Sequence, residues 1–176
     1  MIAGRSDEAR SGAVTTGRYA VLTMDTLGLL IPQHQVHALE PGFDVQRSDG
    51  DEVGWITVTG TDSPVYCLSE DLRPIREVPA GRHICVLLDI GARLIGVLCD
   101  QVVMLEQAGL QILPLPGCMR TPGTPLHGLV LNGERVLCLT SADDLLACVS
   151  EQDLDNPQQP AAESRRRSAL LQGGAL

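Results

Sequence analysis

Two apolar runs separated by a glycine turn stand near the middle of the chain, where Ile84–Cys99 reads ICVLLDIGARLIGVLC. The runs are Ile84–Ile90 and Leu94–Cys99, with Gly91-Ala92 between them. Short runs of Ile, Val and Leu favour β-strands, and glycine between two such runs is typical of a hairpin turn. This segment therefore predicts a pair of antiparallel strands.

Two more hairpins are predicted on either side of this pair. One joins Trp55–Thr59 to Val65–Leu68 through the turn Gly60–Ser63, and the other joins Leu129–Leu131 to Val136–Leu139 through Asn132-Gly133. Asn-Gly between apolar runs is a strong hairpin signal, because both central residues of a type I′ turn need positive φ. Residues 19–31 are also β-prone.

Helical signals are few. Ser141–Ala147 predicts one short helix, with Ser141 as its N-cap and Asp143 and Asp144 in its first turn. Short strands at regular spacing with so little helix are typical of small barrels or a sandwich. The predicted class is therefore mainly β.

Composition excludes several classes of function. Of 176 residues, 13 are basic and 22 acidic, which gives a formal net charge of −9, and every basic residue is Arg. Without Lys there is no Schiff-base or phosphate-binding lysine. An acidic chain with 2% aromatics also lacks the basic face and stacking platforms that nucleic acids need. The core must be aliphatic.

The lack of long apolar runs predicts the cellular compartment of the protein, and the composition of its two terminal segments predicts that they are disordered. No apolar run reaches the roughly 18 residues of a membrane span, and Met1–Gly17 has no signal-peptide core, so we expect a cytoplasmic protein without membrane insertion. Residues 1–17 and 150–176 are predicted to be disordered tails. Arg165–Arg167 could touch an acidic partner or a membrane, although a solvated tail is the simpler interpretation.

An internal repeat is suggested by two matches in the same order. Leu29–Glu40 aligns without gaps on Ile95–Glu106, and Val65–Ser69 aligns on Val136–Thr140. The two matches predict tandem β-units of about 60 residues each. Units this small bury little surface alone, so we expect them to share a core.

No catalytic, cofactor or metal motif is found. The six cysteines form no C-x-x-C pair, and they are interpreted as reduced thiols that act as small buried hydrophobes. His34 and His37 lack neighbouring ligands at metal spacing. Asp89 and Asp100 could form a carboxylate pair, but acids at turns are more often simply exposed. The sequence predicts no enzyme and no cofactor.

Residues 86–102 carry a resemblance to a known family. Gly91-Ala92-Arg93, then Ile95–Leu98, then Asp100-Gln101-Val102 resemble the signature of CheW-like domains, the adaptors of bacterial chemosensory arrays. Ile112–Pro116 and His127–Leu139 resemble the stretches that follow. The resemblance covers about 19–149.

The resemblance implies a fold and a function. The fold is two SH3-like five-stranded β-barrels packed on a shared hydrophobic core, here a domain over 18–149 with subdomains at about 21–78 and 82–149. The function is that of a non-enzymatic scaffold in signal transduction, which couples the cytoplasmic tip of a chemoreceptor to a CheA-type histidine kinase through protein–protein contacts.

The first unit departs from the family pattern. Thr57–Gly60 stands where members usually have Asn-Leu-Arg-Gly, so Thr59 replaces an arginine, and Cys67 replaces an aspartate. Val36–Leu39 stands where members often have Val-x-Glu-Ile. These regions contact the kinase or receptor in the family. The resemblance thus points to a set of partner-binding residues: Val36, Ala38, Thr59, Gly60, Thr61, Asp62 and Val65.

Three hypotheses follow. The first is the adaptor described above. The second is a divergent interaction module that serves a type IV pilus (twitching) system or an unrelated partner, which the missing family residues favour. The third is an enzyme that uses Cys or Asp in a groove between the barrels. A cysteine that is alkylated much faster than the others would support this third hypothesis.

Overall fold

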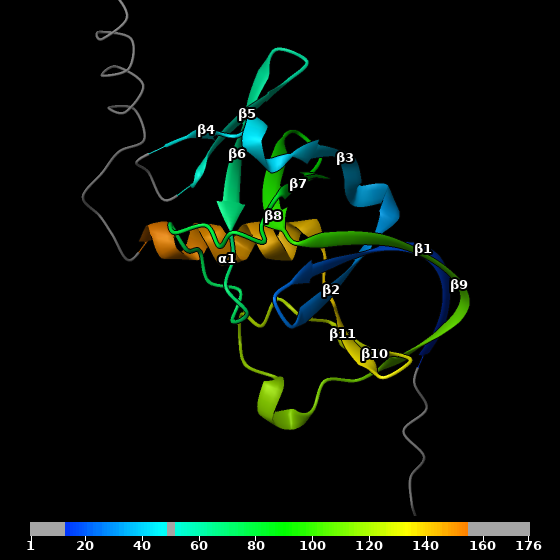
Figure 1. Ribbon diagram of the computed structural model, residues 1–176. Coiled ribbons are helices and arrows are strands. Elements are labelled where there is room, and N and C mark those ends of the chain that lie inside the picture. The colour runs from blue at the N-terminus through cyan, green and yellow to red at the C-terminus, as the bar shows by residue number, and fades with distance from the viewer. Residues whose placement is uncertain (1–12, 49–51, 155–176) are drawn as a thin grey trace, which may run out of the picture.

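The computed structural model describes residues 13–48 and 52–154, and it is built mainly of β-strands (Figure 1). Five strands form a closed barrel in the order β1-β2-β11-β10-β9. They are β1 (Ala13–Met24), β2 (Leu27–Pro32), β9 (Gln101–Leu113), β10 (Gly128–Asn132) and β11 (Arg135–Leu139). The barrel therefore combines the first two described strands with the last three.

The remaining six strands form a second sheet beside the barrel, in the order β3-β7-β8-β6-β5-β4. They are β3 (Val36–Pro41), β4 (Gln46–Arg47), β5 (Gly54–Val58), β6 (Thr61–Cys67), β7 (Ile84–Asp89) and β8 (Leu94–Cys99). Helix α1 (Ala142–Leu154) follows the last strand. Short 3₁₀ helices cover Gln33–Gln35 (η1), Gly42–Asp44 (η2) and Gly117–Met119 (η3).

Both sheets repeat one topology. The order β9-β1-β2-β11-β10 in the barrel corresponds to β3-β7-β8-β6-β5 in the second sheet, and the β2–β11 and β8–β6 pairs are both parallel. The segments 21–78 and 82–149 therefore do not correspond to the two sheets. Instead, the first hairpin of each segment, β1–β2 or β7–β8, pairs with strands of the other segment.

The repeat explains the first sequence match. Leu29–Glu40 and Ile95–Glu106 each run from the second strand of a hairpin into the sheet on the other side. The second match also falls on equivalent strands, β6 and β11, but its register is wrong by three residues. Counted from the hairpin tips, Thr61 corresponds to Arg135 and Ser63 to Leu137.

The second sheet differs from the expected five-stranded barrel. Barrel strand β9 pairs with β1 from Gln101 to Ile112 and with β10 at Ile112 and Leu113. Its counterpart is broken, because β3 ends at Pro41 and the chain turns through η2 before β4 pairs with β5. Gly42 makes this turn close to β7, where an added Cβ would lie 3.0 Å from the His83 backbone. The break leaves the Phe43 side chain 86% exposed.

The three predicted hairpins are confirmed, with changes in their turns. The β7–β8 pair matches the prediction, with Asp89 opposite Leu94. The β5–β6 turn is Thr59-Gly60, so Thr61, Asp62 and Ser63 belong to the strand. In the β10–β11 turn only Gly133 has positive φ, which is typical of type II′ and not of the predicted type I′.

The predicted tails are too long within the described residues. Residues 13–17 belong to β1, because they pair with the far half of β9. Residues 150–154 extend α1 beyond the predicted end at Ala147. Ser141 is the expected N-cap, since its hydroxyl accepts the Asp144 backbone N–H at 3.2 Å. Residues 1–12 and 155–176, including Arg165–Arg167, lie outside the described residues.

A shared core lies between the two sheets, as expected. It contains alternate residues of β1 and β7, such as Leu22 and Leu88, together with Leu145 of α1. The other faces of these strands fill the two sheet interiors, with Val21 inside the barrel and Leu87 inside the second sheet. Burial on both faces explains why β7 is a continuous apolar run from Ile84 to Leu88.

A buried arginine joins the parts of the fold. The Arg82 guanidinium has no exposed surface, and its Nη2 lies 2.7 Å from Asp25 Oδ2 in the β1–β2 turn. Its Nε lies 3.4 Å from Asp100 Oδ1, between β8 and β9. Asp100 also accepts the Asp25 backbone N–H at 2.6 Å. These contacts hold the barrel turn against the second sheet.

Candidate functional site

The β5–β6 turn presents the predicted contact residues at the outer end of the second sheet. Thr59 and Gly60 have φ values of 48° and 81°, as both central residues of a type I′ turn require. Thr59, Gly60, Thr61 and Asp62 are all exposed. The Thr57 hydroxyl donates to Asp62 Oδ1 at 2.8 Å across the hairpin, which orders the start of β6.

The other three predicted contact residues lie deeper. Val36 and Ala38 are half-buried on β3, where Val36 packs on the shared core and Ala38 packs on the interior of the second sheet. Val65 is 0% exposed inside that sheet. A side chain without exposed surface does not touch a partner, so the prediction for Val65 is wrong as a direct contact.

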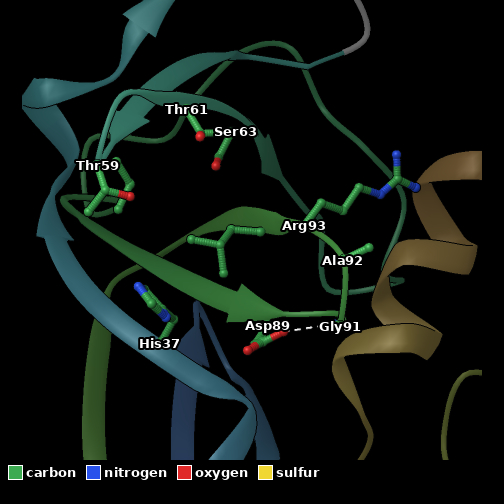
Figure 2. Close-up of a pocket in the computed structure, with 10 residues that line it drawn as sticks. His37, Thr59, Thr61, Ser63, Asp89, Gly91, Ala92 and Arg93 are labelled. Carbon is green, nitrogen blue, oxygen red and sulfur yellow. Dashed lines mark hydrogen bonds between the residues drawn. The ribbon is translucent and has the colours of Figure 1, made fainter.

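An open pocket of about 230 Å³ lies beside the turn (Figure 2). It is bordered by β3, the β5–β6 hairpin and the β7–β8 hairpin. Its lining residues are His37, Val58, Thr59, Thr61, Ser63, Asp89, Gly91, Ala92, Arg93 and Leu94. Thr59 and Thr61 were predicted as contact residues. Ser63, Asp89 and Arg93 were not predicted as contact residues, although the hairpins that contain them were predicted. The pocket forms where two hairpins approach an edge strand, and local sequence patterns do not report that tertiary contact.

The two aspartates considered as a carboxylate pair lie at opposite ends of one hairpin. Asp89 lies at the turn end of the β7–β8 hairpin and accepts the Gly91 backbone N–H at 2.7 Å, whereas Asp100 lies beyond the opposite end of that hairpin. Within the described residues, no group of three His, Cys, Asp or Glu side chains is placed to hold a metal ion.

One cluster contains the residue types of a hydrolase triad, but its geometry differs. His127 Nε2 lies 2.6 Å from Asp144 Oδ2, and the Ser141 hydroxyl donates to the same carboxylate. Activation of a serine nucleophile would require a hydrogen bond from the serine to the histidine. Here the serine is bonded to the acid instead. The cluster caps the start of α1.

The cysteines match the structural interpretation except at Cys118 and at Cys148 of α1, which is half-buried. Cys67, Cys85, Cys99 and Cys138 are buried, while Cys118 on η3 is exposed. Burial raises the pKa of all four buried thiols, to about 12 for Cys85 and Cys99. Thiols of this kind are poor nucleophiles at neutral pH.

Comparisons with known proteins give the fold. No family model matches the chain, and no curated protein matches its sequence. The structure is similar to the crystal structure of scaffolding protein TtCheW from Thermoanaerobacter tengcongensis, with a TM-score of 0.54 and 14% sequence identity. The match covers 72% of this chain and 89% of that one. The chain therefore has a CheW-like fold. No helix in the described residues is long and apolar enough to cross a membrane.

Proposed function

We propose that this chain is a non-enzymatic adaptor of a bacterial chemosensory system, which couples a chemoreceptor to a CheA-type histidine kinase. The observation that carries the proposal is the CheW-like fold, whose similar structure is named a scaffolding protein. A fold alone does not give a function. The second support is therefore local, in the exposed turn at Thr59–Asp62 and the pocket beside it.

The distribution of reactive groups favours binding over catalysis. The buried thiols have raised pKa values, Asp89 and Asp100 lie apart, and the Ser141 hydroxyl is bonded to a carboxylate. The exposed polar turn instead offers backbone and hydroxyl groups to a partner. We also propose a cytoplasmic location, because the kinase and the receptor tip lie in the cytoplasm in such a system.

A divergent partner is the alternative. Thr59 and Cys67 stand where the resembled family has an arginine and an aspartate, and Cys67 is buried. A planar arginine fork binds carboxylates in a geometry that threonine does not offer. This difference favours a partner other than a standard kinase, such as a component of a type IV pilus (twitching) system.

Calorimetric titration with the CheA-type kinase of the same organism tests the proposal. The test variant carries Thr61→Ala and Asp62→Ala. The matched control carries Arg135→Ala and Val136→Ala, at the equivalent positions of the β10–β11 hairpin. We expect micromolar binding, as in transient signalling contacts, that weakens about tenfold in the test variant and is unchanged in the control.

Two outcomes would contradict the proposal. Equal binding by both variants would place the kinase contact away from the β5–β6 turn. No binding by the folded wild-type chain would overturn coupling to that kinase and favour the divergent module, whose partner would then be sought by affinity capture and identified by mass spectrometry.

A further inference from the structure

Ser63 is a polar residue at a position that is apolar in the other sheet. It lies opposite Ile56 on the inward face of the β5–β6 hairpin and is 2% exposed. The equivalent residue of the barrel is Leu137, which lies opposite Val130 and is 1% exposed. Leucine fills the barrel interior here, whereas the shorter serine borders the pocket.

The Ser63 hydroxyl makes no hydrogen bond to another residue that the structure describes. Among those residues the fully enclosed side-chain atoms without a partner are Arg82 Nε and Asp100 Oδ1, so the Ser63 hydroxyl reaches the open pocket. Figure 2 shows it directed toward the pocket, beside the Thr61 hydroxyl, while the His37 ring points in from the opposite side. A hydroxyl that reaches an open pocket and has no protein partner can bond a polar group that enters from outside.

The rest of the lining combines an acid with apolar walls. Asp89 uses Oδ1 to accept the Gly91 N–H, and its other oxygen has no hydrogen bond among the described residues. Val58, Ala92 and Leu94 supply apolar wall. The guanidinium of Arg93, also a lining residue, points away from the other lining side chains (Figure 2). The volume of about 230 Å³ equals roughly eight water molecules, enough for one long side chain.

We propose that this pocket receives an arginine side chain of a partner protein. The inference rests on the proposed function, because it makes this end of the second sheet a partner surface. The arginine stem lies along the apolar wall and its guanidinium donates to Asp89, Ser63 and Thr61. Arginine has five donors and no acceptor, which matches a carboxylate and two hydroxyls. The net charge of −9 also attracts a basic partner.

The test uses small probes, so it does not depend on knowing the partner. Nα-acetyl-arginine methylamide is titrated into the ¹⁵N-labelled full chain, and amide shifts are followed by NMR. The citrulline analogue keeps the shape without the charge, and the lysine and glutamate analogues test specificity. We expect saturable shifts at Ser63, Asp89, Gly91 and Leu94 with arginine, weaker binding with lysine, and about tenfold weaker binding with citrulline.

Two variants assign the effect to the pocket. Asp89→Asn keeps an acceptor for the Gly91 N–H but removes the charge, and Ser63→Leu fills the space as Leu137 does in the barrel. Both are expected to fold, which the amide spectrum itself reports, and to weaken arginine binding about tenfold or more. If Ser63→Leu fails to fold, Ser63→Ala removes the hydroxyl with less change in volume. Arg135→Ala on the other hairpin is the matched control.

The proposal is overturned if the arginine probe gives no saturable shift at these amides. It is also overturned if the citrulline or glutamate probe binds as tightly as the arginine probe, or if the variants bind the arginine probe as tightly as the wild type does. Those results leave the adaptor proposal standing, because that one is tested by kinase binding. Conversely, kinase binding that Asp89→Asn weakens but Arg135→Ala does not would support both proposals.

Discussion

At the scale of single residues, backbone strain is concentrated in the turn that carries the candidate surface. Thr59 is β-branched and has a φ of 48°, a left-handed conformation that costs an L-residue about 1–2 kcal/mol. Its side chain is exposed and lines the pocket. Strained backbone conformations cluster at ligand clamps and other functional sites, so the strain at Thr59 supports the assignment of this turn as the candidate surface.

Thr59→Asn is expected to raise the free energy of unfolding by about 1 kcal/mol, since asparagine tolerates left-handed φ and Asn-Gly suits a type I′ turn. Urea unfolding followed by circular dichroism measures the change. Thr61→Asn, in the following strand, is the control and should be neutral or destabilising. Equal effects of the two substitutions would contradict strain at Thr59.

Cysteine reactivity should follow exposure alone. In the native protein at pH 8, iodoacetamide is expected to modify Cys118 first, while Cys85 and Cys99 react only after unfolding because burial raises their pKa to about 12. Tandem mass spectrometry of tryptic peptides over time measures the rates, since Cys99 and Cys118 share the peptide Leu94–Arg120 and are distinguished by fragmentation. The rate at Cys118 should not exceed that of a free model thiol. A faster reaction, or rapid labelling of a buried cysteine, would revive the enzyme hypothesis.

At the scale of elements, α1 depends on a carboxylate at its start. Burial raises the pKa of Asp144, but hydrogen bonds from Ser141 and His127, and the charge of His127, outweigh it and hold this pKa below its usual value. A carboxyl with a lowered folded pKa stabilises the protein above the unfolded pKa, about 3.9, and loses that contribution as pH falls through the folded value.

Asp144→Asn is therefore expected to lower the melting temperature at pH 6 and to have little effect well below pH 3.9. A plot of melting temperature against pH should consequently be flatter on the acid side for this variant than for the wild type. Thermal unfolding across that range gives the comparison. Asp143→Asn is the control, because Asp143 is exposed on the same turn and shares none of these bonds. A constant difference between Asp144→Asn and the wild type at every pH would contradict the assignment.

The elements also show how far sequence reasoning reaches. Hairpins were predictable because their signals are local, in apolar runs and turn glycines such as Gly91. The partner of each strand was not, because the exchange of hairpins between segments is decided by which faces meet in the shared core. The same limit applies to the pocket. Ser63 is visible as a polar residue in a strand, but its inward position follows from a turn at Thr59-Gly60, earlier than predicted.

At the scale of the whole molecule, Arg82 links elements that are distant in sequence. Arg82→Met leaves Asp25 and Asp100 without their cation, and breaking a buried ion pair in this way costs about 3–5 kcal/mol when both partners are buried. Both carboxylates are partly solvated here, so we expect a loss of about 2 kcal/mol in urea unfolding. Arg93→Met, on an exposed turn, should change stability by less than about 0.5 kcal/mol. Equal losses would contradict a special role for Arg82.

The exchange of hairpins makes the two halves of the chain depend on each other. The barrel needs β1–β2 from the first half and β9–β11 from the second, and the second sheet needs β7–β8 in return. A chain divided between Ala80 and Gly81, in an exposed loop, therefore yields two fragments that each lack the partners of their first hairpin. Neither fragment can bury the shared core alone, since that core takes strands from both.

We expect each fragment alone to lack cooperative thermal unfolding, and an equimolar mixture to regain the circular dichroism and amide spectrum of the intact chain. Dilution should lower the melting temperature of the mixture but not that of the intact chain, because association is bimolecular only in the mixture. Cooperative unfolding of either fragment by itself would mean that a half forms its own sheet, and it would contradict the exchange. Reconstitution would instead show that the two halves fold as one unit, although the sequence presents them as tandem repeats.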